Sequence, residues 1–192
     1  MVWFAHRADW IDNSEYDRSV VFSIDAYDLF GCVVEDLLRM LFVLGSGGHT
    51  TRGLILSEWL NEESYYMVPW ESDHTKKRVK KNYFSVISPR IRAKSNRILT
   101  IIRTLFLFCH SLIILLIVRP NIVISTGSGI SFPTLLLARL FRAKSVYIES
   151  PSRVHEPSIA GRMLIGKVTR WFSSWKELAE TSEEIEYGGI IS

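Results

Sequence analysis

The sequence predicts an α/β protein whose parallel β-sheet is covered by helices on both faces. Short apolar runs alternate with helical segments along most of the chain, and two of these runs end in glycine-rich loops that open a helix. A strand that is apolar along its whole length is typical of a parallel sheet, because both of its faces are buried. Alternation with helices indicates βαβ units, so a Rossmann-like sheet is expected.

The expected strands are the apolar runs, and the expected helices are segments between them. We expect strands at Leu41–Leu44, Tyr65–Val68, Phe84–Ile87, Ile122–Ser125, Ser145–Ile148 and Arg170–Phe172. We expect helices at Thr50–Leu60, Lys94–Val118, Pro133–Phe141, Ser158–Lys167 and Lys176–Glu180. Pro133 suits the first turn of its helix, and Ser158 can cap the N-terminus of its own.

Length and composition indicate one domain behind an atypical extension. The chain has 192 residues, of which 47% are hydrophobic, which is enough for one sizeable core but short for two. Residues 1–36 hold eight acidic residues without a clear period. We therefore expect 1–39 to be an N-terminal extension or an incorrectly assigned start, and 40–192 to be the domain. Cys32 and Cys109 form neither a disulfide framework nor a zinc pattern, which favours a reducing compartment.

The first glycine-rich loop, Gly45–Thr50, follows the first expected strand and opens a helix. Glycines allow a tight turn and a close approach of the backbone to a ligand. The free N–H groups and the positive dipole end of a helix favour phosphate. The dinucleotide fingerprint fails because Thr50 replaces its last glycine, and the Gly-Lys-Ser/Thr of a Walker loop is absent. The alternative is a tight turn without a ligand.

A second glycine-rich loop, Ser125–Pro133, follows another apolar strand and has the same physical properties. Two such loops at the ends of strands in one sheet can hold a diphosphate from two sides, because their N–H groups spread its negative charge. The candidate diphosphate ligands in the two loops are Gly45, Ser46, Gly47, Gly48, Thr50, Thr126, Gly127 and Gly129.

His49 and Glu149 are the candidate catalytic residues. His49 is the only one of the five histidines in a glycine loop, where it can bind phosphate or accept a proton. Glu149 ends an expected strand and can act as a general base or orient a hydroxyl. Arg153 offers a fork for phosphate, although a structural Glu149–Arg153 pair is the alternative. None of the histidines has the spacing of a metal site, so no metal is expected.

The charge distribution predicts contact with an anionic surface. Between His74 and Ile148 there is no acidic residue, whereas 14 of the 23 Lys and Arg residues lie there. Such a window usually meets nucleic acid or lipid headgroups, and few aromatic residues interleave with it, which disfavours nucleic acid. We expect these residues to contact the membrane: Lys76, Lys77, Arg78, Lys80, Lys81, Arg90, Arg92, Lys94 and Arg97.

The segment Ile98–Val118 is almost as apolar and as long as a transmembrane helix. Arg103 and His110 would be costly in the middle of a bilayer. Three interpretations remain open, namely a buried core helix, a helix lying in the membrane interface, and a true span. Basic residues beside a long apolar helix are typical of a peripheral anchor on anionic lipid, which favours a membrane surface as the partner.

The order of these motifs resembles one known family. The motifs in question are Gly45–Thr50, Tyr66–Asp73 with Lys76 and Lys77, Ser88–Arg90, Pro120–Ile124, Ser125–Pro133, Ile148–Arg153, Ser158–Gly161, Trp175 and Tyr187–Gly189. They come in the order found in the asparagine-linked glycosylation protein fourteen family, and the resemblance runs from about Met40 to the C-terminus. That family provides the acceptor-half, membrane-anchoring subunit of a UDP-N-acetylglucosamine transferase, and bacterial capsule and exopolysaccharide subunits are similar.

The resemblance implies the N-terminal, acceptor-binding half of a GT-B glycosyltransferase, with a partner subunit supplying the donor-binding half. By similarity, the two glycine loops face the diphosphate of the acceptor and the catalytic cleft. Glu149 matches the acidic position after the fifth strand of the family. No cofactor is implied, because the UDP-sugar is a substrate.

We therefore expect a membrane-associated subunit that helps to transfer N-acetylglucosamine from a UDP-sugar to a polyprenyl- or dolichyl-diphosphate-linked acceptor. His49 is the first candidate for the base and Glu149 the second. The expected location is the cytoplasmic face of a membrane, which is the endoplasmic reticulum in a eukaryote and the plasma membrane in a prokaryote. One alternative is a non-catalytic anchor or activator for capsule or exopolysaccharide synthesis with a different UDP-sugar. Another is a nucleic-acid-binding α/β protein.

Overall fold

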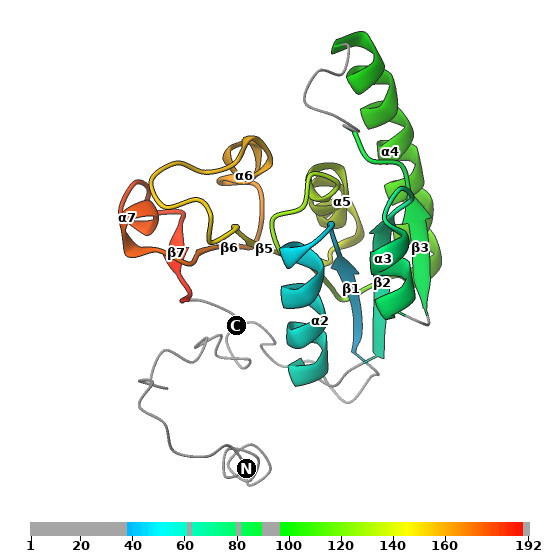
Figure 1. Ribbon diagram of the computed structural model, residues 1–192, viewed down its shortest axis with the longest axis horizontal. Helices are drawn as coiled ribbons and strands as arrows, with labels where there is room; N and C mark the ends of the chain where they lie inside the picture. Colours follow the sequence, from blue (N-terminus) through cyan, green and yellow to red (C-terminus); the bar gives the residue numbers. More distant parts are fainter. Residues whose placement is uncertain (1–37, 61–62, 80–81, 90–96, 190–192) are drawn as a thin grey trace, which may run out of the picture.

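The computed structural model describes residues 38–60, 63–79, 82–89 and 97–189, and this part of the chain has the expected α/β fold (Figure 1). Its strands form one parallel sheet in the order β3-β2-β1-β4-β5-β6-β7. The strands are β1 (Arg39–Val43), β2 (Glu63–Pro69), β3 (Tyr83–Val86), β4 (Ile122–Ser125), β5 (Lys144–Ile148), β6 (Arg170–Ser173) and β7 (Glu186–Tyr187).

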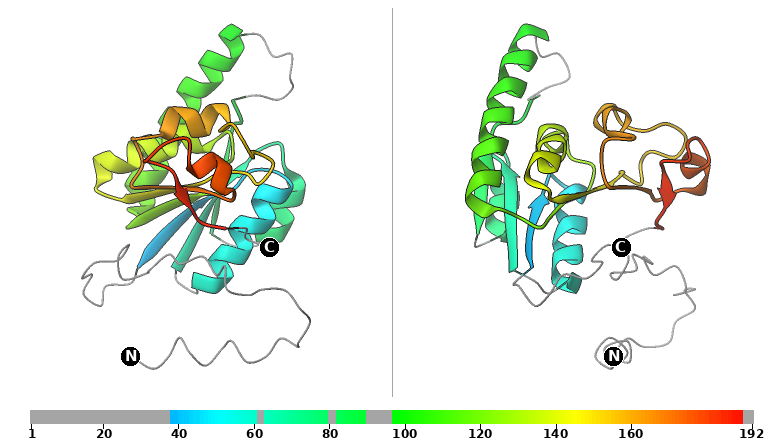
Figure 2. Two further views of the ribbon diagram at one scale, coloured as in Figure 1. Left: turned by 90° about the vertical axis from the view of Figure 1, so that its left-hand side faces the viewer. Right: turned by 180° about the vertical axis from the view of Figure 1, so that it is seen from behind.

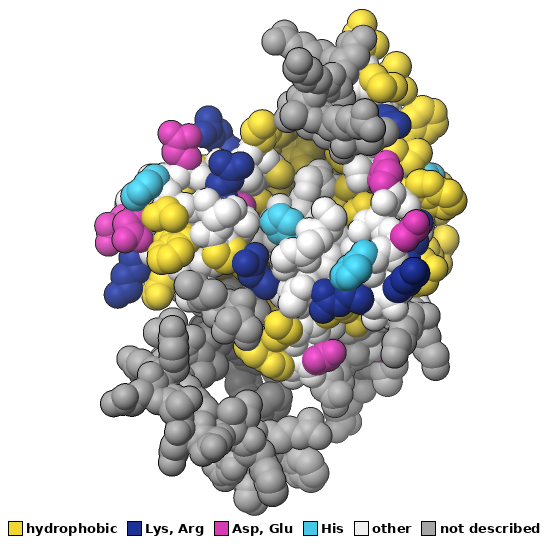
Figure 3. Space-filling model, in the orientation of Figure 1, with side chains coloured by type: hydrophobic (Ala, Val, Ile, Leu, Met, Phe, Trp, Pro, Cys, Tyr) yellow, Lys and Arg dark blue, Asp and Glu magenta, His cyan; other side chains and the backbone are white. Residues whose placement is uncertain are grey.

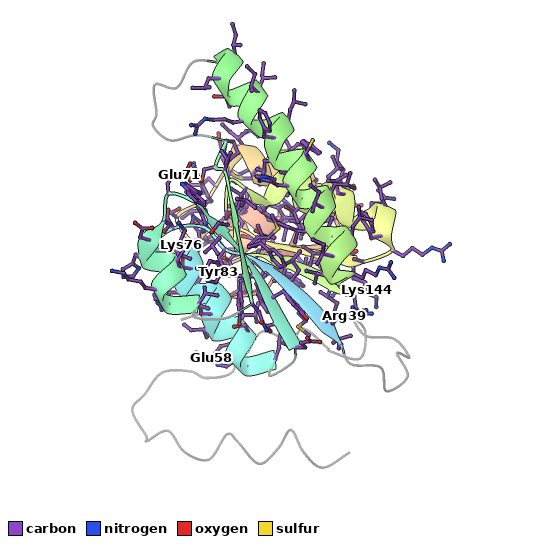
Figure 4. The ribbon with its side chains drawn as sticks, turned by 90° about the vertical axis from the view of Figure 1, so that its right-hand side faces the viewer. Arg39, Glu58, Glu71, Lys76, Tyr83 and Lys144 are labelled. Carbon is purple, nitrogen blue, oxygen red and sulfur yellow. The ribbon has the colours of Figure 1, made fainter. Side chains whose placement is uncertain are left out.

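Helices lie on both faces of the sheet, as Figures 2 and 4 show from several sides. The described helices are α2 (Gly48–Leu60), α3 (Asp73–Val79), α4 (Arg97–Val118), α5 (Ser131–Ala138) with a 3-10 turn η1 (Arg139–Phe141), α6 (Ile159–Leu164) and α7 (Lys176–Ala179). Helices α2 and α3 pack on one face, and α4 to α7 pack on the other.

Alternation along β1 explains how one sheet supports two cores. Leu41 and Val43 point into the core beneath α4 and α5, whereas Met40 and Phe42 point into the core beneath α2. All four side chains are fully buried. Because successive side chains of a strand point to opposite faces, a strand with helices on both sides must be apolar at every position.

The strand order reverses beside β1, which positions the site. β1 pairs with β2 on one side and with β4 on the other, and Val43 lies opposite Ser125 at the carboxyl ends of β1 and β4. Loops that leave neighbouring strands in opposite directions open a crevice at such a switch point. Both glycine loops start here, so their nearness follows from the topology.

The expected elements are confirmed apart from their ends and two omissions. Ser158 caps α6 by accepting from the Gly161 N–H, as expected, but α6 ends at Leu164, before the expected Lys167. The prediction missed α3 because its sequence is polar and shows no apolar period. It missed β7 because that strand has only two residues. Residues 1–37, most of the expected extension, lie outside the described residues.

Candidate functional site

The two glycine loops lie in direct contact at the carboxyl ends of β1 and β4. A Cβ atom placed on Gly45 would lie 3.0 Å from Cβ of Ser128 and 3.1 Å from Cβ of His49. Any side chain at position 45 would therefore push the second loop away from the first. The structure brings together the two loops that the sequence predicts to act as a pair.

The first loop presents unused backbone donors to the solvent. Ser46, Gly47 and Gly48 are exposed, and no described residue accepts a hydrogen bond from their N–H groups. Gly47 has a φ of +65°, a conformation that favours glycine, and its O accepts from the N–H groups of Thr50 and Thr51. Free N–H groups in such a turn at the start of α2 are suited to bind an anion.

His49 is fixed by a reciprocal pair of hydrogen bonds with the second loop. Its Nδ1 lies 2.6 Å from the carbonyl O of Thr126, and the Thr126 hydroxyl donates to the carbonyl O of His49 at 2.7 Å. A carbonyl can only accept, so Nδ1 carries the proton. In the neutral ring, Nε2 is then the nitrogen with a lone pair, as a general base requires.

The hydroxyls of the two threonines predicted as diphosphate ligands bind groups of the protein. Thr50 is buried, and its hydroxyl donates to the Gly45 carbonyl at 2.9 Å and lies 3.0 Å from the hydroxyl of Thr75 on α3. Thr126 is also buried, and its hydroxyl is engaged by His49. Both hydroxyls are thus already bonded inside the protein, and the expected contact of these two residues with phosphate stays a prediction.

The glycines of the second loop have different roles. Gly127 has a φ of +87°, and a Cβ there would lie 3.1 Å from the N atom of Ser150 and 3.2 Å from the O atom of Ile148. It therefore lets the second loop pack against the end of β5. Gly129 is exposed, and a Cβ there would meet nothing within 4 Å. Of these two glycines, Gly129 has open space where a ligand could approach.

Glu149 is buried and holds the β5–α6 connection. Its carboxylate accepts from the N–H groups of Ser150 and Ser158, both at 2.8 Å, and from the Tyr147 hydroxyl at 3.3 Å. Only 1% of Glu149 is exposed. Burial, followed by the charge of Glu149, raises the pKa of the Tyr147 phenol above its usual range. These contacts give Glu149 a structural role and leave His49 as the more accessible candidate base.

Arg153 lies on the same β5–α6 connection and is exposed. Within the described part of the chain, no ion pair joins it to Glu149, so the alternative of a structural pair is not seen. Its side chain makes no hydrogen bond to either glycine loop in those residues. Its binding of diphosphate stays a prediction.

The start of the expected membrane-contacting cluster lies on α3. Lys77 and Arg78 are exposed, and the ammonium of Lys76 donates to the Trp70 carbonyl at 2.5 Å and lies 4.6 Å from the centre of the Trp70 ring. The remaining members fall outside the described side chains, namely Lys80, Lys81, Arg90, Arg92, Lys94 and Arg97. Lys76 is labelled on α3 in Figure 4.

Helix α4 has an exposed apolar side that runs along its whole length, here called the outer face of α4. Figure 3 shows these hydrophobic side chains along the helix, whose N-terminal part rises beyond the other helices in Figures 1 and 2. Exposure ranges from 39% at Leu112 to 66% at Ile98. The outer face consists of Ile98, Ile101, Ile102, Leu105, Phe106, Leu112, Ile113, Leu116 and Ile117.

The polar residues of α4 are turned away from its outer face. Arg103 lies 3.8 Å from the Glu71 carboxylate and 3.5 Å from the Ser88 carbonyl, which ties α4 to the ends of β2 and β3. His110 is half-buried. Among the described helices, Ile98–Val118 alone is long and apolar enough to cross a membrane, judged by length and composition. A buried core helix is not what the structure shows, because most of this helix is exposed.

Arg52 lies beside the first glycine loop and is not among the residues predicted from the sequence. It lies on the first turns of α2, and both terminal nitrogens of its guanidinium lie 4.0 Å from where a Cβ of Gly48 would stand. The available signal was a basic residue four positions after a loop glycine, since side chains at i and i+4 share a helix face and lean toward the N-terminus.

The fold and the paired loops define one half of a GT-B-type protein. The solved structure of MurG from Acinetobacter baumannii matches with a TM-score of 0.57 at 13% identity, covering 72% of this chain and 41% of that one. In sequence, residues 40–191 match the model of the family described as oligosaccharide biosynthesis protein Alg14 like. The chain belongs to this family.

Two curated relatives show the range of the similarity. The UDP-N-acetylglucosamine transferase subunit ALG14 of Candida albicans is 25% identical over 172 residues, which covers 80% of this chain and 78% of that protein. The UDP-N-acetylglucosamine–N-acetylmuramyl-(pentapeptide) pyrophosphoryl-undecaprenol N-acetylglucosamine transferase of a Wolbachia strain from Drosophila simulans is 30% identical over 141 residues. That match covers 72% of this chain and 36% of the relative.

Proposed function

We propose that this chain is the acceptor-binding subunit of a membrane-associated glycosyltransferase. The enzyme would transfer N-acetylglucosamine from UDP-N-acetylglucosamine to a sugar on a polyprenyl or dolichyl diphosphate. The observation that carries the proposal is the contact between the two glycine loops in a member of the Alg14-like family, because it places free N–H donors and a positioned histidine side by side. Relatives named as transferase subunits, or as a transferase acting on a pyrophosphoryl-undecaprenol, support the substrate class.

The chemistry assigned to the site is a single displacement at the anomeric carbon. The acceptor hydroxyl oxygen forms a bond to that carbon, the bond to the β-phosphate oxygen breaks, and UDP leaves with the electron pair. His49 Nε2 takes the hydroxyl proton, since Nδ1 is committed to the Thr126 carbonyl. The N–H groups of Ser46, Gly47 and Gly48, with Gly129 opposite, would hold the acceptor diphosphate.

A partner subunit would supply the donor-binding half. The chain aligns with less than half of MurG and with most of a relative that is itself named a subunit. In this arrangement, the carboxyl edge of the sheet faces the partner across the acceptor. The UDP-sugar is a substrate, and the proposal requires no cofactor.

The outer face of α4 would rest in the interface of the membrane that holds the lipid acceptor. A helix with one apolar side and its arginine turned inward suits a location in the plane of the interface. The exposed cations of α3 would add attraction to anionic headgroups. The proposed location is therefore peripheral, on the cytoplasmic side, in the endoplasmic reticulum of a eukaryote or the plasma membrane of a prokaryote.

The test of catalysis is sugar transfer by the chain purified with its donor-binding partner. Radiolabelled UDP-N-acetylglucosamine and a polyprenyl-diphosphate-linked sugar are the substrates, and intact complex is verified by gel filtration. His49→Ala is expected to lower kcat by about 10²- to 10⁴-fold, the usual contribution of a general base. The control is His74→Ala, an exposed histidine of α3. Unchanged transfer in His49→Ala would support a non-catalytic anchor instead.

Vesicle flotation tests the proposed contact of the outer face of α4 with the membrane. A variant with Ile101→Ser and Leu105→Ser on the outer face of α4 is compared with Ile159→Ser, an equally exposed isoleucine of α6. Removing two apolar side chains from the interface is expected to weaken binding at least tenfold, since each contributes about 1 kcal/mol or more. Equal vesicle binding by all three proteins would refute the proposed membrane contact. Wild-type protein that binds no vesicles at any salt concentration would refute it as well.

A further inference from the structure

Arg52 brings an uncompensated positive charge to the first glycine loop. It lies four residues after Gly48 on the same face of α2, with both terminal guanidinium nitrogens 4.0 Å from the position of a Gly48 Cβ. No described carboxylate forms an ion pair with it. Arg52 is half-buried, and this burial lowers the pKa of its guanidinium below the ordinary value.

A second arginine increases the positive charge at the same end of α2. Arg78 of α3 donates to the hydroxyl of Thr51 at 2.8 Å. The first turn of α2 contains no acidic residue. Helix N-termini normally attract acidic side chains because the dipole is positive there, so cations in this position oppose the local preference. Departures from a local rule concentrate at functional sites, where a ligand compensates them.

Geometry distinguishes Arg52 from the other cations near the site. Arg78 already donates to Thr51, and the Arg153 side chain makes no hydrogen bond to either glycine loop within the described residues. The Arg52 guanidinium lies beside exposed Gly48, whose N–H has no described acceptor. A guanidinium can donate two parallel hydrogen bonds to two oxygens of one anion, which a single backbone N–H cannot do.

We propose that Arg52 binds the diphosphate of a substrate together with the N–H groups of the first glycine loop. Diphosphate fits better than a single carboxylate, because the three loop N–H groups and the Arg52 guanidinium together offer more donors than the two oxygens of one carboxylate can accept. The proposed function places the diphosphate of the lipid-linked acceptor here, and the diphosphate of the UDP-sugar is the alternative source. Only this choice of source rests on the proposed function.

The class of ligand is tested with inorganic pyrophosphate and the full chain, by isothermal titration calorimetry at low salt. Wild-type protein is expected to bind, and Arg52→Gln to bind about tenfold or more weakly, since hydrogen bonds to charged groups are strong. Arg52→Lys keeps the charge without the fork and should lie between the two. Arg139→Gln, an exposed arginine outside the site, is the matched control.

Circular dichroism and thermal melting verify that each variant is folded. If Arg52→Gln does not fold, the comparison of wild-type protein with Arg52→Lys replaces it. Pyrophosphate binding that is equal in wild-type protein and in both Arg52 variants would overturn the inference. So would a wild-type protein that binds no pyrophosphate.

Steady-state kinetics of the complex then identify the source of the diphosphate. A rise of about tenfold in KM for the lipid-linked acceptor, with KM for UDP-N-acetylglucosamine unchanged, assigns Arg52 to the acceptor. The reverse pattern assigns it to the nucleotide sugar. A complex that transfers no sugar while pyrophosphate binding still depends on Arg52 would refute the proposed function and leave this inference standing.

Discussion

Replacing Glu149 by alanine is expected to destabilise the protein through the β5–α6 connection. The buried carboxylate accepts hydrogen bonds from the N–H groups of Ser150 and Ser158, both at 2.8 Å, and a third from the Tyr147 hydroxyl. Alanine removes every one of these acceptors at once. A Cβ on Gly161 would lie only 2.3 Å from Oε2 of Glu149, which shows how closely α6 is packed on this carboxylate.

The expected loss follows from the two N–H groups. A hydrogen bond to a charged acceptor contributes about 1.5–3 kcal/mol, and a buried donor left without a partner costs about 1–3 kcal/mol. For Glu149→Ala we expect the free energy of unfolding to fall by about 3–5 kcal/mol. Glu149→Gln keeps one oxygen but turns an NH₂ toward one of the two N–H donors, so we expect a loss of about 2 kcal/mol.

Urea unfolding followed by tryptophan fluorescence measures both variants. Glu183→Ala, an exposed glutamate, is the control and should stay within about 0.5 kcal/mol of the wild type. A loss below about 1 kcal/mol in Glu149→Ala would show that the carboxylate does not hold the connection. If Glu149→Gln is as stable as the wild type and still loses transfer more than about a hundredfold, Glu149 is a base rather than a support.

Two further predictions concern neighbouring hydroxyls. Thr126→Val keeps the shape of the side chain but removes its hydrogen bond to the His49 carbonyl. We expect the variant to lose about 1 kcal/mol of stability and to show a lower kcat with an altered pH profile, whereas Thr126→Ser should remain close to wild type. Equal pH profiles of kcat for the two variants would contradict a positioning role for Thr126. Burial and the Glu149 charge raise the pKa of Tyr147, so above pH 10, the usual value for a tyrosine, the unfolded chain releases this proton while the folded chain keeps it. The free energy of unfolding should therefore fall as pH rises above about 10, by up to about 1.4 kcal/mol per pH unit, and urea titrations of Tyr147→Phe should lack this part of the slope. An identical slope in the variant would refute the assignment.

The fold was accessible from sequence because its strongest signals are local. A fully apolar run such as Leu41–Leu44 favours a strand of a parallel sheet with helices on both faces. The glycine loops could be located for the same reason, since each directly follows such a strand. Helix α3 could not be found in this way, because a polar helix has no apolar period and is held by tertiary contacts such as the Thr50–Thr75 hydroxyl pair.

The roles of individual side chains were harder to predict because they depend on contacts between distant segments. Thr50 and Thr126 sit in loops that suit phosphate, yet both hydroxyls are used inside the protein. Glu149 ends a strand at the functional edge, yet its carboxylate turns toward the start of α6. In the sequence nothing separates Arg52 from an ordinary helical residue, whereas in the structure its guanidinium lies beside Gly48 of the first glycine loop. Motif position thus predicted which two loops lie together, and packing decided which of their groups stay exposed.

The bond between His49 and Thr126 also constrains the order in which this protein can mature. These residues are 77 positions apart, and the whole of α4 lies between them. Closing so long a loop is entropically costly, so contacts of this kind form late in folding. A nascent chain that has emerged only as far as α4 carries one glycine loop and no partner for its histidine. Helix α4 lies between these two residues in the chain, so it must be made before the two glycine loops can meet.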